Sequence, residues 1–181
     1  MKRQRVLLSL FVAIVVLATG SCSSDQSPTG VTAVAPSDQA PSNSLLGDLL
    51  RPVGLLQCTP MAAAKTTKTI GPEGGVIQVG PHTLFIPAGA LAKPVTITAT
   101  APSDDVNSVQ FSPSGLTFDK SAWLTMSYSN CNLLGRLLPK RIAYTSDDLR
   151  SVLYYLLSLD NLFSKQVTGK VDHFSRYAVS W

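Results

Sequence analysis

Glycine and proline divide residues 71–91 into short apolar runs, and this pattern strongly limits the folds that the chain can adopt. The segment reads Gly71-Pro72-Glu73-Gly74-Gly75-Val76-Ile77-Gln78-Val79 and, after Gly80-Pro81-His82-Thr83, continues as Leu84-Phe85-Ile86-Pro87-Ala88-Gly89-Ala90-Leu91. Short apolar runs bounded by glycine and proline are typical of strands joined by turns. We therefore expect a strand, a tight turn, a second strand and a corner at Pro87-Ala88-Gly89, with proline at the second position of a type I turn and glycine at the fourth.

From about Lys65 onward, apolar and polar residues alternate with a period of two. The clearest case is Val95–Ala101, and further runs are centred on Val109–Phe111, Leu124–Tyr128 and Ile142–Tyr144. Such alternation predicts strands with one buried face. Short strands separated by turn residues indicate an all-β fold, and we expect an antiparallel β-sandwich over residues 65–181.

Two details of this domain are less clear in the sequence. The leucine- and tyrosine-rich stretch after Leu149 predicts a strand from Val152 to Ser158, followed by a loop through Asp160-Asn161. A helix is the alternative, because short apolar runs are poorly resolved by periodicity. His82 follows Pro81 in a predicted loop, and we expect it at the surface.

The N-terminus has the pattern of an export signal. Three basic residues stand among the first five positions, and the run from Val6 to Ala18 is apolar except for Ser9. This run is too short for an ordinary membrane-spanning helix, which needs about 20 residues. A basic start, a short apolar run and small residues after it predict a signal peptide over residues 1–21.

The residues around Cys22 resemble a bacterial lipobox. Small residues precede the cysteine in Leu17-Ala18-Thr19-Gly20-Ser21-Cys22. The resemblance implies diacylglycerol on the Cys22 sulfur and cleavage just before it, so the chain would be held on a membrane by lipid. Cleavage after Gly20, with Cys22 left as a thiol, is the alternative. Ser23 and Ser24 follow the cysteine, and by resemblance to lipoprotein sorting in double-membraned bacteria they favour the outer membrane or cell surface over the inner membrane.

Residues 22–64 are predicted to be a tether between the lipid and the folded domain. Residues 23–43 are rich in Ser, Pro, Thr, Asp and Gln, and they cannot bury enough apolar surface to offset the entropy of ordering. Ser44–Leu50 then has leucines at helical spacing behind a possible serine cap, and Pro52 ends it. We expect this short amphipathic segment to pack on the domain near Cys58.

Cysteine usage and charge limit the possible partners. With Cys22 lipidated, Cys58 and Cys131 remain, and an oxidising compartment favours a disulfide between them over two buried thiols. The chain has two histidines and no cluster of metal ligands, so we predict neither a metal nor a cofactor. Without the three basic residues of the signal, 12 of the 15 basic residues remain against 11 acidic residues, and no nucleic-acid partner is predicted.

Several motifs resemble the ZU-five domain, the β-sandwich of ankyrins, netrin receptors and tight-junction proteins. They are the Gly74-Gly75 turn, Ile86-Pro87-Ala88-Gly89-Ala90-Leu91, Gly115-Leu116-Thr117-Phe118 and His173-Phe174-Ser175-Arg176-Tyr177. The resemblance covers roughly Thr69 to Trp181 and implies a sandwich that binds partner proteins or packs against a neighbouring domain. The chain has no ankyrin repeats, death domain or spectrin-type neighbour, so the partner would be an unknown envelope protein.

The same resemblance carries a chemical alternative. Some family members cut themselves between the Phe and the Ser of a His-Phe-Ser tripeptide, which maps onto His173, Phe174 and Ser175. Ser175 Oγ would attack the Phe174 carbonyl carbon, His173 would accept the hydroxyl proton, and water would hydrolyse the ester. We expect an intact chain instead, with the tripeptide in the final strand and a bulge near Ser175 that allows Phe174 and Tyr177 to be buried together.

Three functions therefore compete. The first is a non-enzymatic envelope lipoprotein that displays a β-sandwich as an interaction or structural module. The second is a self-cleaving protein that uses His173, Phe174 and Ser175. The third is a carbohydrate-binding sandwich, for which Trp123 and Trp181 are the tryptophan candidates and which requires an exposed aromatic platform on one sheet face.

Overall fold

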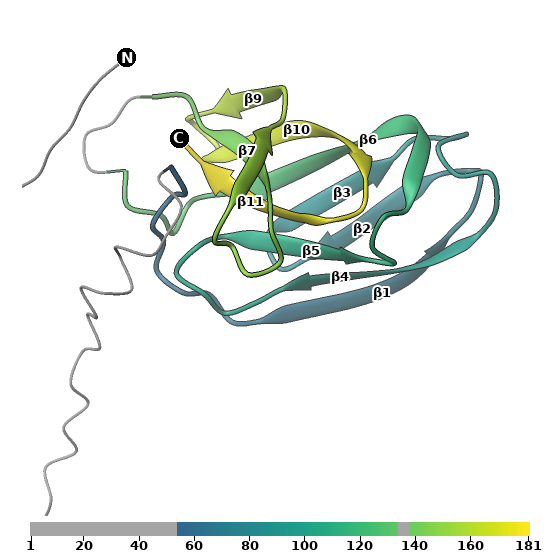
Figure 1. Ribbon diagram of the computed structural model, residues 1–181, viewed down its shortest axis with the longest axis horizontal. Helices are drawn as coiled ribbons and strands as arrows, with labels where there is room; N and C mark the ends of the chain where they lie inside the picture. Colours follow the sequence, from purple (N-terminus) through teal and green to yellow (C-terminus); the bar gives the residue numbers. More distant parts are fainter. Residues whose placement is uncertain (1–53, 134–137) are drawn as a thin grey trace, which may run out of the picture. The chain divides into compact units, whose positions relative to one another are not determined.

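The protein folds as two antiparallel sheets packed face to face, and the expected all-β sandwich is confirmed (Figure 1). The computed structural model describes residues 54–133 and 138–181, and no helix is present in those two ranges. Residues 1–21, Cys22 and the amphipathic segment 44–50 lie outside the described residues.

Eleven strands build the two sheets within the described ranges. The six-stranded sheet has the order β1 (Ala64–Ile70), β4 (Val95–Ala101), β5 (Ser108–Ser112), β11 (Arg176–Ser180), β7 (Arg141–Thr145) and β8 (Val152–Tyr155). The five-stranded sheet has the order β2 (Gly75–Val79), β3 (His82–Ile86), β6 (Thr117–Ser127), β10 (Gln166–His173) and β9 (Ser158–Asn161).

The alternation in Val95–Ala101 produces β4 with the predicted bounds. Ile97 and Ala99 point inward and are buried. On the other face, the Thr96 hydroxyl is hydrogen-bonded to that of Thr69 on β1 at an O–O distance of 2.9 Å. The Thr98 hydroxyl is hydrogen-bonded to that of Thr67, also at 2.9 Å. One strand thus contributes both a core face and a polar surface ladder, as a period of two requires.

The corner after β3 differs by one residue from the expected turn. The Ala90 N–H donates to Pro87 O at 3.1 Å, so Pro87 is the first residue of the turn and not the second. Gly89 is then the third residue, with a φ of 74° that suits glycine. Gly74 has a φ of 77°, and a Cβ added there would lie 2.5 Å from Ile86 O. The turn before β2 therefore lies against the end of β3, and at Gly74 this close approach leaves no room for a side chain.

The stretch after Leu149 was predicted as one strand and a loop, and this was wrong. β8 ends at Tyr155, the chain crosses to the other sheet at Leu156, and Asp160-Asn161 belongs to strand β9. Leu156 is buried, and its N–H donates to Ile142 O at 2.8 Å, which fixes the crossing. The Asp160 carboxylate accepts from the Tyr128 hydroxyl at 2.6 Å and from the Lys140 N–H at 2.8 Å, so a residue predicted in a loop instead fastens a strand.

His82 is also placed differently from the expectation. It starts β3 and is buried between the sheets, where its Nδ1 accepts from the Ser127 N–H at 3.2 Å. Burial lowers the pKa of His82 from 6.5 to about 4, because the charged imidazolium would lose its hydration. The residue therefore belongs to the core in its neutral form.

The two sheets differ in what covers their outer faces. The main core lies between them and includes Phe111, Phe174 and Tyr177. A second, smaller cluster covers the outside of the six-stranded sheet. It consists of Leu55, Val106, Ala143, Leu149 and Ala178. Among the described residues, no corresponding cluster covers the outside of the five-stranded sheet.

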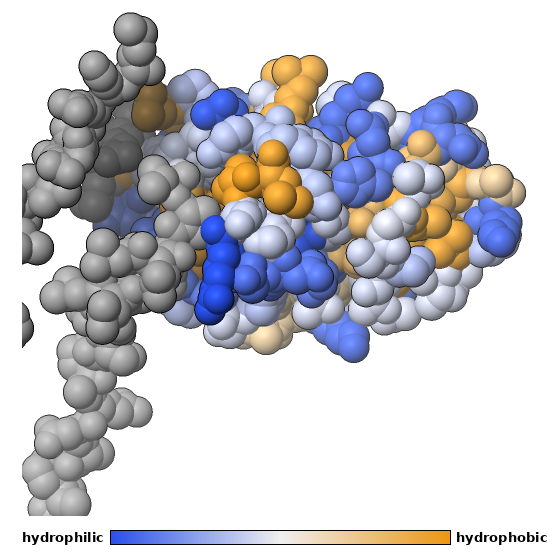
Figure 2. Space-filling view, viewed as in Figure 1, coloured by the Kyte–Doolittle hydropathy of each residue, from blue (hydrophilic) through white to orange (hydrophobic). Residues whose placement is uncertain are grey.

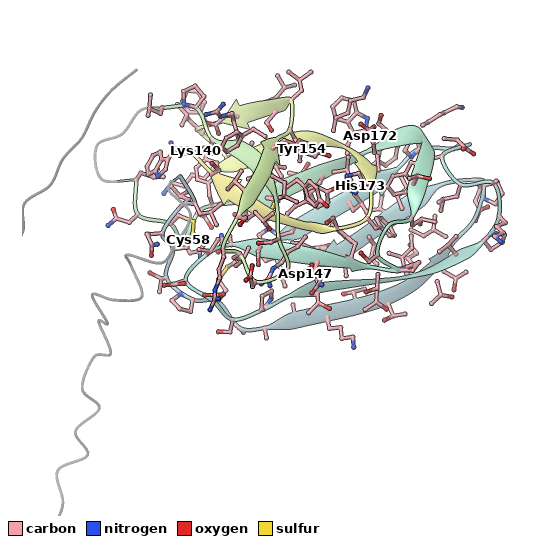
Figure 3. All side chains as sticks on the ribbon, in the orientation of Figure 1. Cys58, Lys140, Asp147, Tyr154, Asp172 and His173 are labelled. Atoms are coloured by element: carbon pink, nitrogen blue, oxygen red, sulfur yellow. A yellow bond between two sulfur atoms is a disulfide. The ribbon has the colours of Figure 1, made fainter. Side chains whose placement is uncertain are left out.

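The two termini of the described chain meet at one end of the sandwich. Leu55 bridges Ser180, and the Trp181 N–H donates to Gly54 O at 2.9 Å. The expected disulfide joins Cys58 to Cys131 beside them, and Figure 3 shows Cys58 at this end. Packing begins before the boundary expected at residue 65, because Leu55 and Leu56 are already buried.

Candidate functional site

The outer face of the five-stranded sheet carries a row of apolar side chains. Val76 pairs with Phe85, Phe85 pairs with Trp123, and Trp123 pairs with Lys170. The Lys170 N–H donates to Leu157 O, which places Leu157 at the far end of the same row. We call Val76, Phe85, Trp123 and Leu157 the apolar row.

The members of the apolar row are unusually exposed for their size. Phe85 is 47% exposed, Trp123 39% and Leu157 83%. Figure 2 shows apolar side chains at the surface over the β8–β9 segment. Single exposed apolar residues are normal on a protein surface, whereas a contiguous set marks an interaction site. Val76, Phe85 and Trp123 form such a set as paired neighbours, and Lys170 stands between Trp123 and Leu157.

Polar side chains run beside the apolar row. Thr83 pairs with Thr125, and the Thr125 hydroxyl lies 2.9 Å from that of Thr168 on β10. Trp123 and Thr168 also border a shallow surface groove of about 880 Å³, together with Asn161, Gln166 and the β9–β10 turn. The face therefore combines flat apolar surface with hydroxyl and amide groups, a mixture that suits recognition.

The His-Phe-Ser tripeptide lies at the opposite end of the sandwich from Cys58, where the chain passes from one sheet to the other. His173 ends β10, Arg176 starts β11, and Phe174 and Ser175 form the connection between them. The tripeptide was expected within the final strand, and this was wrong. The expected irregularity exists, but it falls between Val171 and His173, where the pairing of β10 with β6 shifts register.

Phe174 points into the core from this corner. Its ring stacks on Phe111 with 5.3 Å between centroids and meets Phe118 edge-on at 5.0 Å. Phe174 and Tyr177 are both buried, as expected, and the Tyr177 hydroxyl donates to His173 O at 2.6 Å. The change of sheet lets both aromatic rings enter the same core.

The backbone of the corner is held by hydrogen bonds on both sides. The Phe174 N–H donates to Leu116 O at 2.7 Å, and Phe174 O accepts from the Gly115 N–H at 3.0 Å. Ser175 O accepts from the Phe111 N–H at 3.0 Å. Neither Phe174 nor Ser175 has a positive φ. This peptide therefore resembles an ordinary structural corner more than a strained bond.

His173 is engaged by tyrosines. Its Nε2 lies 3.0 Å from the Tyr154 hydroxyl, and its ring meets Tyr144 edge-on at 5.0 Å (Figure 3). Its Nδ1 lies 3.5 Å from Phe174 O, and no hydrogen bond connects His173 with the Ser175 hydroxyl within the described chain. The nucleophile and the base of the acyl shift are thus close in sequence, but they are not hydrogen-bonded to each other.

The tyrosines at the corner have raised pKa values. Burial is the main cause for both Tyr154 and Tyr177, and the negative charge of Asp172 adds to it. Both phenols therefore stay protonated at neutral pH and can donate hydrogen bonds, but they cannot act as bases there.

The sequence anticipated some of this site and missed the rest. Trp123 was a carbohydrate candidate and does lie on an exposed sheet face, whereas Trp181 follows β11 and packs under the Lys140 ammonium at 4.2 Å. Phe85 and Leu157 were not candidates. Phe85 alternates with Leu84 and Ile86, which are buried, and this period of two is the signal that it faces outward.

The described residues contain no group of three metal-ligating side chains and no helix long and apolar enough to cross a membrane. No protein-family model matches this sequence, and no curated protein matches it as a relative. The class of protein defined here is therefore an antiparallel β-sandwich, and the ZU-five resemblance stays a prediction from its motifs.

Proposed function

We propose that this protein is an exported, lipid-anchored β-sandwich of ZU-five type that binds a partner protein of the cell envelope and carries out no catalysis. The lipid would be attached to Cys22, and the outer membrane or cell surface is the expected location. The observation that carries the binding function is the apolar row on a sheet face over which the described residues place no apolar cluster. Aromatic residues on such a face are typical of interaction sites.

Photo-cross-linking in the native envelope tests the binding face. A photoreactive phenylalanine at Phe85 should give a discrete adduct with one partner, and Trp123→Ala should remove it. Lys65 is an exposed residue on β1 in the other sheet and serves as the matched control position. Equal adducts at both positions, or none at Phe85, would contradict the proposal.

The anchor is tested separately from the face. The mature protein should fractionate with membranes and carry the mass of the acyl groups, because several acyl chains hold a protein stably on a bilayer. Cys22→Ala should release the protein or trap its precursor. A freely soluble wild type without acyl mass would refute the anchor and would leave the binding face untouched.

A glycan is the second candidate ligand, and one observation in the structure specifically favours it. Phe85 and Trp123 are paired neighbours that form an aromatic platform, and Gln166, Thr168 and Asn161 supply amide and hydroxyl groups beside it. Sugar rings stack their apolar faces on aromatic rings and hydrogen-bond such groups. Co-sedimentation with purified envelope polysaccharide decides between the two ligands. Binding that Trp123→Ala abolishes would favour the glycan.

Self-cleavage is the third candidate, and our proposal leaves it out. The backbone N–H and the carbonyl of Phe174, on either side of its Cα, are both hydrogen-bonded, and His173 is engaged with Tyr154. Nucleophilic catalysis needs a nucleophile within hydrogen-bond reach of its base, and this arrangement supplies sequence neighbours without that contact.

A further inference from the structure

Three segments far apart in the sequence end at the side of the sandwich where the described chain begins. β9 and β6 end at residues paired with Gln166, the first residue of β10. β11 ends at Ser180, which pairs with Arg141 at the start of β7. Leu55 bridges Ser180, so Gly54 lies at this same end. Figure 1 shows the C-terminus, the end of β9 and the start of the described chain together on one side.

The β9–β10 turn projects apolar side chains from this end. Phe163 is 103% exposed, and Leu162 beside it is also exposed. The side chain of Asn161 holds the turn, because its Oδ1 accepts from the N–H groups of Phe163 at 3.1 Å and Ser164 at 3.2 Å. Lys165 O accepts from the Tyr128 N–H at 2.9 Å, which fixes the other side of the turn. Phe163 therefore points outward from a turn that hydrogen bonds hold on both sides.

A third exposed apolar side chain, Leu138, belongs to a segment that is tied to β9. Leu138 is 56% exposed, and the segment that carries it is tied to β9 because the Lys140 N–H donates to the Asp160 carboxylate. Lys140 also donates from Nζ to Leu138 O, which shapes the segment. We call Leu138, Leu162 and Phe163 the apolar tip.

The position of the proposed lipid anchor relative to Gly54 indicates which surface the apolar tip faces. Residues 22–53 run from the proposed lipid to Gly54, which is at the same end of the sandwich. The tether predicted for these residues from their composition would have a root-mean-square span of about 30 Å. The anchor therefore keeps this end close to the bilayer at a high effective concentration, so that even a weak contact is populated.

We propose that the apolar tip docks on the lipid bilayer and inserts Phe163 and Leu162 into its interfacial region. The charges near this end have both signs, with Lys140, Arg141 and Lys165 against Asp105 and Asp160, so apolar insertion and not charge attraction leads the contact. The strands then stand upright on the membrane. The groove that Trp123 shares with the β9–β10 turn then opens at the bilayer surface, whereas Val76 and Phe85 lie on the strands of the five-stranded sheet farther from that turn. This inference rests on the proposed lipid anchor.

Depth-dependent quenching in vesicles tests the contact. The lipidated full chain carrying Phe163→Trp is reconstituted in vesicles of phosphatidylethanolamine and phosphatidylglycerol with brominated acyl chains. Compared with wild type, which supplies the background of Trp123 and Trp181, the new tryptophan should be quenched and blue-shifted. Leu153→Trp on β8 is the matched control, because Leu153 is also exposed but lies away from the apolar tip, and it should not be quenched.

A second measurement separates this inference from the anchor. The unlipidated mature chain, Cys22→Ser, should co-float weakly with the same vesicles, and Phe163→Ser should lower its partition coefficient by about tenfold. Leu153→Ser should leave it unchanged. Absence of acyl groups on the native protein, with co-flotation retained, would refute the anchor and keep the docking. An acylated protein whose Phe163→Trp signal is not quenched would overturn the docking, as would Phe163-dependent dimerisation in sedimentation without vesicles.

Discussion

Phe174 and Phe163 show how little a residue type says about its contribution to stability. Both are phenylalanines near a change of direction, yet Phe174 is buried against Phe111 and Phe118 while Phe163 is fully exposed. The difference comes from the tertiary structure: one corner crosses between the sheets and the other projects from their end.

Truncation of the two residues should therefore have opposite consequences. Phe174→Ala should lower the free energy of unfolding by about 3–5 kcal/mol, because it leaves a cavity in the core. Phe163→Ala should change it by less than about 0.5 kcal/mol. Urea unfolding of the two variants beside wild type measures both values. Similar effects from both would contradict the burial described here.

Burial of His82 gives the protein a pH-dependent stability. Its folded-state pKa of about 4 lies below the value of 6.5 expected in the unfolded chain. Between these values the unfolded state binds a proton that the folded state does not, so the free energy of unfolding falls as the pH falls from about 6.5 to about 4. The contribution is at most about 3 kcal/mol.

The test compares the pH dependence of unfolding in wild type and His82→Asn, a variant that keeps a side-chain acceptor for the Ser127 N–H. The slope between pH 6.5 and pH 4 should be smaller in the variant. Parallel curves over this range would show that His82 is not the group responsible.

At the scale of elements, the sequence predicted the positions of strands better than it predicted which sheet each strand joins and what covers it. Val95–Ala101 was placed correctly because its alternation reflects one buried face. The strand predicted over Val152–Ser158 ran past the end of β8, and Asp160-Asn161 of β9 was assigned to a loop, because Leu156 and Leu157 continue an apolar run and periodicity does not show that the chain has changed sheets. Trp123 was named as a carbohydrate candidate, but whether its sheet face is covered depends on a layer that no local sequence pattern describes.

The Cys58–Cys131 bond ties two elements that are far apart in the chain. The cysteines are 73 residues apart, and the chain-entropy model gives about 4 kcal/mol of stabilisation for such a loop. Thiol labelling of the unfolded, non-reduced protein should modify neither residue, and reduction should lower the midpoint of urea unfolding. A Cys58→Ala, Cys131→Ala double variant should behave like the reduced protein, whereas quantitative labelling before reduction would refute the bond.

For the molecule as a whole, we expect an intact chain. Protein held for days at neutral pH should keep its full mass, because the Phe174 carbonyl accepts a hydrogen bond from the Gly115 N–H and His173 is engaged with Tyr154. Mass spectrometry checks this against Ser175→Ala. The appearance of the seven-residue fragment Ser175–Trp181 in wild type alone would establish self-cleavage in place of our proposal.

The position of the disulfide also determines how the domain carries mechanical load. A force applied to the chain before Gly54 acts first on the Leu55–Ser180 bridge and on the hydrogen bond from the Leu56 N–H to Val179 O. These backbone contacts can break one after the other. The force then reaches Cys58, and the covalent bond passes it to Cys131, just beyond the end of β6. Strands β1 to β6 lie inside the closed loop and cannot be unravelled from that side. Because Trp123 is on β6, tension between the proposed anchor and the proposed partner on the apolar row would run through a covalent bond and a central strand.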